Sequence, residues 1–164
     1  MVGLLGEIGV VCADDRSTIN EQHVGSNLKR RSFESDLPIY KSYAELSTEE
    51  KARVKDAYES MPEADEPPYP EYGLQQIWVP INKLADALSK NGVALRGPFT
   101  ATVRVDGTGK GRSISIFETP DPDFNKPAAI ILLKKATYKP ARCGGQPCVM
   151  DFPVHINFVA GPLD

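Results

Sequence analysis

Two of the three cysteines are placed where they can react with each other. Cys143 and Cys148 flank residues 144–147 (GGQP), whereas Cys12 stands alone. A Gly-Gly-x-Pro turn can bring two Cβ atoms to the separation of about 4 Å that a disulfide needs. We therefore expect a disulfide between Cys143 and Cys148 and, with it, an oxidising compartment. A pair of reduced thiols in a cytosolic protein is the alternative.

The acidic residues and histidines form no recognisable catalytic or metal-binding pattern. Asp121 and Asp123 flank a proline, and a turn accounts for both of them. A zinc site at the cysteines would require His155 and His23 as ligands, which makes it the weakest alternative. Because no nucleophile–base pair, metal-ligand spacing or cofactor fingerprint is present, we expect no enzyme, no metal and no cofactor.

The glycine-rich residues 107–111 (GTGKG) contain a Gly-Lys pair but do not match a phosphate-binding loop. A P-loop requires G-x-x-x-x-G-K-[ST] between a strand and a helix, whereas here a glycine follows the lysine and a strand comes next. The segment is better explained as the turn of a β-hairpin. Its strands are predicted by alternating apolar residues over Phe99–Val105 and Arg112–Phe117.

A capping box predicts the first helix. In Ser47-Thr48-Glu49-Glu50 the serine hydroxyl can accept the amide of Glu50, whose carboxylate reaches back. The helix is expected to run to Pro62, with Val54, Ala57, Tyr58 and Met61 on its buried face. Three prolines within residues 63–70 then predict an extended, stiff connector lying on its own domain.

Two further helices are predicted, each with a proline in its first turn. The second covers Ile77–Lys90 and contains Pro80, and the third covers Lys126–Ala136 and contains Pro127. Proline is tolerated in a first turn because that turn has no internal partner for its amide.

The last predicted strand, Phe152–Phe158, is expected at the edge of a sheet. Phe152, Val154, Ile156 and Phe158 alternate with Pro153, His155 and Asn157, so one face is apolar and the other polar. A proline cannot donate to a neighbouring strand, so it is confined to an edge or to a strand's first residue. His155, on the polar face, is expected to face solvent.

Composition and charge suggest a soluble chain with two units. The chain has 164 residues, is 41% hydrophobic and carries a net charge of −3, which argues against a nucleic-acid partner. No apolar run approaches the roughly 20 residues of a membrane span. Residues 1–92 contain 10 basic and 16 acidic side chains, net −6, whereas residues 93–164 contain 9 and 6, net +3. We expect a flexible tail over 1–36, a helical extension over 37–92, and a second unit over 93–164.

The first residues leave several alternatives open. Residues 1–11 (MVGLLGEIGVV) are apolar but short, and Val11-Cys12-Ala13 has the small-residue character of a signal-peptidase site. A signal remnant, an arbitrary start and a frayed terminus are all compatible with this pattern.

Residues 95–159 resemble the carboxyl-terminal domain of the TonB energy transducers. The resemblance depends on the hairpin around an Asp-Gly turn, on the helix that leads into Tyr138-Lys139-Pro140-Ala141, and on the Gly145-Gln146-Pro147 turn. The closing strand, residues 152–158 (FPVHINF), completes it. The resemblance implies an α+β fold: a small antiparallel three-stranded sheet with helices packed on one face, here preceded by the helical extension.

The resemblance also implies a function. It predicts a periplasmic, non-enzymatic protein-binding module whose last strand pairs with an extended segment of an outer-membrane transporter or another envelope protein. The expected binding residues are Phe152, Val154, His155, Ile156, Asn157 and Phe158. Pairing of this strand with a second copy, giving a homodimer, is a further possibility. The alternative function is that of an inhibitor, an immunity-type protein or an accessory envelope protein on the same scaffold.

Overall fold

The computed structural model describes residues 18–20 and 37–159. It has an α+β fold with three α-helices and antiparallel sheets, as expected. The stretch interpreted as a possible signal remnant lies outside the described residues, as does most of the expected tail. None of the described helices is both long and apolar enough to cross a membrane.

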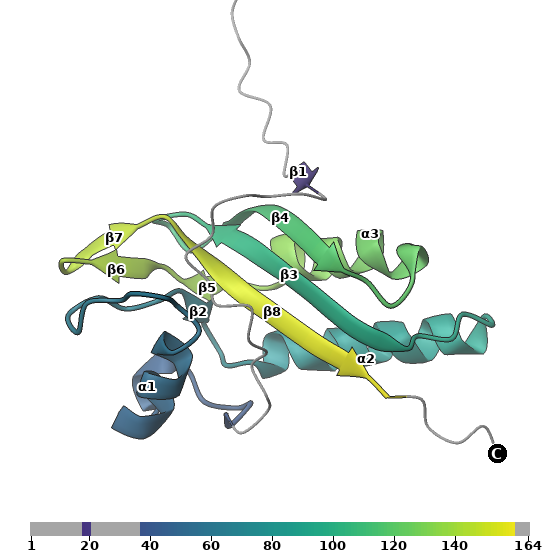
Figure 1. The fold of residues 1–164 in the computed structure, drawn as a ribbon, viewed down its shortest axis with the longest axis horizontal. Helices are drawn as coiled ribbons and strands as arrows, with labels where there is room; N and C mark the ends of the chain where they lie inside the picture. The colour runs from purple at the N-terminus through teal and green to yellow at the C-terminus, as the bar shows by residue number, and fades with distance from the viewer. Residues whose placement is uncertain (1–17, 21–36, 160–164) are drawn as a thin grey trace, which may run out of the picture.

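The central sheet has the strand order β1-β4-β3-β8 (Figure 1). Its three long strands are β3 (Gly97–Val105), β4 (Gly111–Glu118) and β8 (Met150–Phe158), and both of their pairings are antiparallel. These are the three strands that the sequence predicted. A short strand, β1 (Thr18–Asn20), adds a parallel pairing to the outer side of β4. This strand falls within the predicted tail, because three residues show too little alternation to predict a strand.

One face of the sheet forms the core. The inward residues of β3 are fully buried, and α2 (Gln75–Lys90) and α3 (Pro122–Ile130) cover this face (Figure 1). Phe124 of α3 packs edge-on against Phe99 of β3, with ring centroids 5.0 Å apart. Ile77 and Ile81 of α2 are buried in the same cluster. The prediction of helices on one face is therefore confirmed for these two elements.

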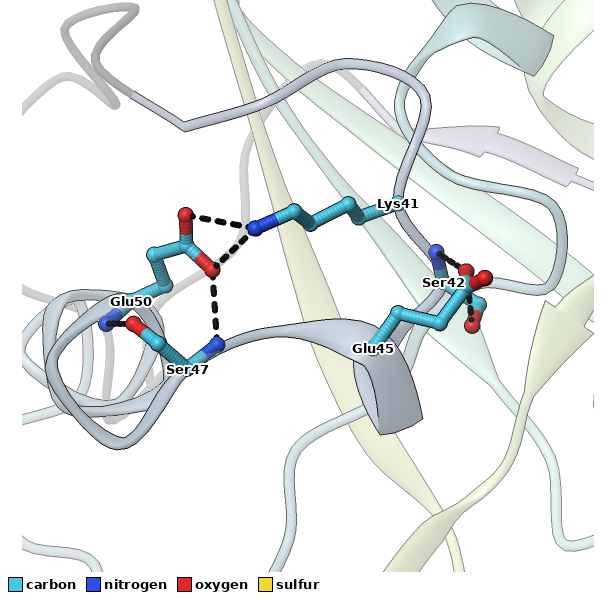
Figure 2. A network of polar contacts seen from close by, with 5 residues as sticks. All are labelled: Lys41, Ser42, Glu45, Ser47 and Glu50. Atoms are coloured by element: carbon cyan, nitrogen blue, oxygen red, sulfur yellow. Dashed lines mark hydrogen bonds and ion pairs between the residues drawn. The ribbon is translucent and has the colours of Figure 1, made fainter.

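The segment before the sheet begins with two capping boxes in succession. Ser42 and Glu45 cap the short 3-10 helix η1 (Tyr43–Glu45), and Ser47 and Glu50 cap α1 (Thr48–Lys55). Figure 2 shows both pairs, with Lys41 donating to the Glu50 carboxylate at 3.1 Å. The predicted capping box of Ser47 and Glu50 is confirmed. Ser42 and Glu45 form another one with the same Ser-x-x-Glu spacing, five residues earlier.

Helix α1 ends well before Pro62, where the sequence analysis placed its end. Beyond Lys55 the chain continues in tighter turns, with the Tyr58 amide donating to the Lys55 carbonyl at 3.0 Å. Val54, Ala57 and Tyr58 are buried as predicted, whereas Met61 is only half-buried. Tyr58, beyond the end of this helix, donates its hydroxyl to the Asp151 carbonyl of the strand over residues 150–158.

The proline-rich connector lies on its own domain, as expected. β2 (Tyr69–Pro70) pairs with β5 (Tyr138–Lys139), and Glu66 exchanges backbone hydrogen bonds with Arg142 at 2.9 and 2.8 Å. The Tyr69 side chain is fully buried between Tyr43 and Phe152. Residues 37–92 thus share one apolar core with the sheet.

Helix α2 begins two residues earlier than predicted. Its start is set by Gly73, which has φ +86° and lies so close to the carbonyls of Ile39 and Lys41 that no side chain would fit there. Pro80 is therefore inside the helix rather than in its first turn. The predicted end is confirmed: Asn91 is the C-cap residue and Gly92 has a positive φ.

Helix α3 begins four residues before the predicted start. The Asp121 carboxylate accepts the Asp123 amide at 2.8 Å, and Pro122 is the first helical residue. Asp121 is thus an N-cap residue, and Pro127 is an interior proline. The helix continues into a π-helical turn, η2 (Ile131–Lys135), in which the Ala136 amide donates to the Ile131 carbonyl.

Two tight turns complete the sheet end of the molecule. Asp106 organises the β3–β4 turn by accepting the amides of Thr108 and Lys110 and the guanidinium of Arg112. Desolvation alone would raise the pKa of Asp106. The hydrogen bond from the Thr108 hydroxyl, at 2.7 Å, and those from the two amides and Arg112 together outweigh it and hold the pKa far below the usual range.

The second turn carries the cysteines. Cys143 ends β6 (Ala141–Cys143) and Cys148 ends β7 (Gln146–Cys148), and the two form a disulfide with a Cα–Cα distance of 5.8 Å. Gly144 and Gly145 make the turn with positive φ angles. The Gly144 amide donates to Asp65 at 2.8 Å, so this hairpin is tied to the connector.

Candidate binding edge

Strand β8 is the last strand of the sheet on the side away from β4. It pairs with β3 over nine consecutive residues, from Gly97 with Phe158 to Val105 with Met150, without a register shift. The edge position that Pro153 predicted is therefore confirmed for the described residues. The other side of the strand is where an additional strand would have to pair.

Two observations show which backbone groups of β8 face outward. The Tyr58 hydroxyl donates to the Asp151 carbonyl at 2.9 Å, so this carbonyl is not directed at β3. Backbone groups alternate sides along a strand, so those of Pro153, His155 and Asn157 also point away from β3. Pro153 fits this assignment because its missing amide would otherwise leave a gap in the pairing with β3.

Tyr58 closes one end of this outer edge. Burial, followed by the nearby Asp151 and Tyr43, raises the pKa of Tyr58 far above its usual range, so the hydroxyl stays protonated as a donor. The Asp151 carboxylate is also paired, with Arg104 at 3.1 Å. Beyond Asp151, no hydrogen bond from a residue that the structure describes reaches the outward backbone groups of Pro153, His155 and Asn157.

The six predicted binding residues fall into two groups. Phe152, Val154 and Ile156 have buried side chains, at 2%, 5% and 3% exposure, and Phe158 is half-buried against Phe124 with ring centroids 5.1 Å apart. These side chains support the strand from inside. His155 and Asn157 lie on the opposite face, and their backbone groups are the ones directed outward.

His155 is held in place by a chain of side chains across the sheet. The Thr100 hydroxyl donates to Glu118 at 2.6 Å, so it acts as acceptor toward the His155 Nδ1, which lies 3.0 Å away. His155 lies on the polar face of the strand, where it was predicted to face solvent, but this arrangement leaves it half-buried. The contact orients the ring along the sheet, away from the outer edge of the strand.

A narrow apolar groove runs along the same edge. β8 forms one wall over residues 152–156. The other wall combines the segment just before η1 with the start of α2: Leu37, Ile39, Leu74, Ile77 and Trp78. Its volume of about 40 Å³ is far below the roughly 300 Å³ of a small-molecule pocket. Such a groove accommodates the tip of an aliphatic side chain, not a complete small ligand.

Two features of this site were not found from the sequence. One is the Tyr58 hydroxyl on Asp151, which joins residues 93 positions apart. The other is the groove wall, which brings Leu37 and Trp78 together from separate segments of the predicted helical extension.

Comparison of the chain with models of known protein families, with curated proteins and with solved structures found no match. The function is therefore inferred from the outer edge of β8 and its groove.

Proposed function

We propose that this protein is a binding module that adds an extended segment of a partner protein to the outer edge of β8. In this mode, main-chain hydrogen bonds provide affinity and the pockets beside the strand select side chains. The proposal depends on the run of outward backbone groups at Pro153, His155 and Asn157. No hydrogen bond from a residue that the structure describes reaches them, and they lie beside an apolar groove.

The position of the groove supports this mode of binding. Side chains of an added strand alternate between the two faces of the sheet. Those on the core side of the sheet would extend toward Leu74 and Trp78, where an aliphatic tip loses its contact with water. Tyr58 limits the open stretch at the Asp151 end, so the partner segment is short.

The finer proposal follows the resemblance to the TonB carboxyl-terminal domain. It makes the partner a segment of an outer-membrane transporter or another envelope protein, and the compartment the periplasm. The Cys143–Cys148 disulfide agrees with an oxidising compartment. Pairing of β8 with the same strand of a second copy would use the same groups.

Substitutions at two residues of β8 test the proposal. Asn157→Pro removes one outward amide donor, so it is expected to weaken binding of the partner segment at least tenfold. Asn157→Ala keeps the amide and is the matched control, with binding near that of the unchanged protein. His155→Ala is expected to cost about 1 kcal/mol or less, because only a side chain is lost.

The partner segment comes from affinity capture out of envelope extract, followed by titration of its synthetic peptides. Fluorescence of Trp78, the one tryptophan of the chain and a wall residue of the groove, reports on binding. Circular dichroism verifies that each variant is folded. If His155→Ala abolishes binding and a folded Asn157→Pro does not, side-chain chemistry governs the site and strand addition is wrong.

A further inference from the structure

A second groove lies on the other side of the molecule's helical layer, between α2 and α3. α2 contributes Pro80, Lys83 and Leu84, and α3 with its π-helical continuation contributes Pro127, Ile130, Ile131 and Lys135. Its volume of about 400 Å³ lies within the range of small-molecule sites, unlike the groove beside β8.

The floor of this groove is apolar and partly open to water. Ile130 is 46% exposed although it is a large aliphatic residue at the end of α3. Leu84 and the two prolines are half-buried beside it. An apolar ligand body resting here would remove this surface from water, which is favourable in proportion to the area covered.

The charges at the groove have one sign. Its lining includes Lys83 and Lys135, one from each helix, and no acidic residue. Neither lysine has an ion pair within residues 37–159, whereas Lys41 and Lys139 are both paired with glutamates. Two ammonium groups next to an apolar floor complement a negative charge attached to a hydrocarbon body.

We propose that the α2–α3 groove binds a single-chain anionic amphiphile, such as a medium-chain fatty carboxylate. The hydrocarbon chain lies along Pro80, Leu84 and Ile130, and the carboxylate lies between Lys83 and Lys135. The ligand is a free amphiphile that lies between the two helices, and not a bilayer surface. This site is independent of the strand-addition edge, which lies beside β8.

Titration with decanoate, below the concentration at which it forms micelles, tests the proposal. Backbone amide NMR shifts on the full chain are expected to move for residues of α2 and η2 and to stay unchanged in β8. The double variant Lys83→Gln with Lys135→Gln is expected to bind decanoate at least tenfold more weakly. Decanol, which has the same chain but no charge, is expected to bind more weakly than decanoate by a similar factor.

The matched control is Lys126→Gln with Lys134→Gln. These exposed lysines of the same helical segment do not line the groove, so the variant has the same net charge as the test variant and should retain decanoate binding. Ile130→Thr provides a second, apolar test and is expected to weaken binding severalfold. Equal binding by both double variants, equal binding of decanol, or binding of anionic vesicles without binding of decanoate would each overturn the proposal.

Discussion

At the scale of single residues, Tyr58 links the helical extension to the candidate edge. Its hydroxyl satisfies the Asp151 carbonyl at 2.9 Å, and the residue is buried. Tyr58→Phe leaves that carbonyl without this donor, so we expect the free energy of unfolding to fall by about 1–3 kcal/mol. Chemical denaturation measures the change. Tyr72→Phe is the control, because Tyr72 is 63% exposed and should leave stability unchanged; equal effects would contradict the role given to Tyr58.

Glu50 gives the fold a dependence on acid pH. The Ser47 amide, helped by Lys41, lowers the pKa of the Glu50 carboxyl in the folded state. The unfolded chain therefore binds this proton more readily, so the contribution of Glu50 is present above the ordinary glutamate pKa and is lost as pH falls through the folded value. Figure 2 shows the contacts involved.

Glu50→Gln is accordingly expected to reduce the loss of stability between neutral and acid pH. Thermal unfolding measured across this range reports the difference. Glu49→Gln is the neighbouring control, since Glu49 makes no side-chain hydrogen bond to a described residue. If the stability of Glu50→Gln and of the unchanged protein falls in parallel as pH is lowered, protonation of Glu50 does not contribute to the pH dependence of stability.

At the scale of elements, the β6–β7 hairpin depends on its disulfide. The ring closed by Cys143 and Cys148 is small, so the chain-entropy estimate of its stabilisation is only roughly 2 kcal/mol. The double variant Cys143→Ser with Cys148→Ser is expected to lose about this amount while keeping the fold, because Asp65 and Glu66 still hold the hairpin.

Mass spectrometry after alkylation without reductant tests the bond in protein from an oxidising compartment. Neither Cys143 nor Cys148 should be modified, and both should be after reduction. Modification of both before reduction would show that the disulfide is absent, and the inference of an oxidising compartment would fail with it.

At the scale of the whole molecule, the connector is part of the core rather than a hinge. Pro67, Pro68 and Pro70 are fully buried, and Tyr69 lies between aromatic residues from both parts of the chain. We expect limited proteolysis with a protease of broad specificity to spare residues 62–70. Early cleavage there, with release of a stable fragment 93–164, would show instead that the two parts fold independently.

The sequence by itself determined the elements whose cause is local. The α1 capping box, the Asp106 turn and the disulfide each depend on residues within six positions of one another, and Pro153 marks an edge by its missing amide. The start of α3 at Asp121 is also set by neighbouring residues, because the Asp121 carboxylate accepts the Asp123 amide. The sequence predicted a turn there, since an aspartate makes the same hydrogen bond in a turn and in a helix cap.

Only the tertiary structure decided what depends on distant contacts. The position of Gly73 against Ile39 set the start of α2, and the contact of Tyr58 with Asp151 set which backbone groups of β8 face outward. Both grooves likewise combine residues from separate elements. Contacts of this kind leave no periodicity in the sequence, because they depend on how the elements pack and not on the order of residues within any one of them.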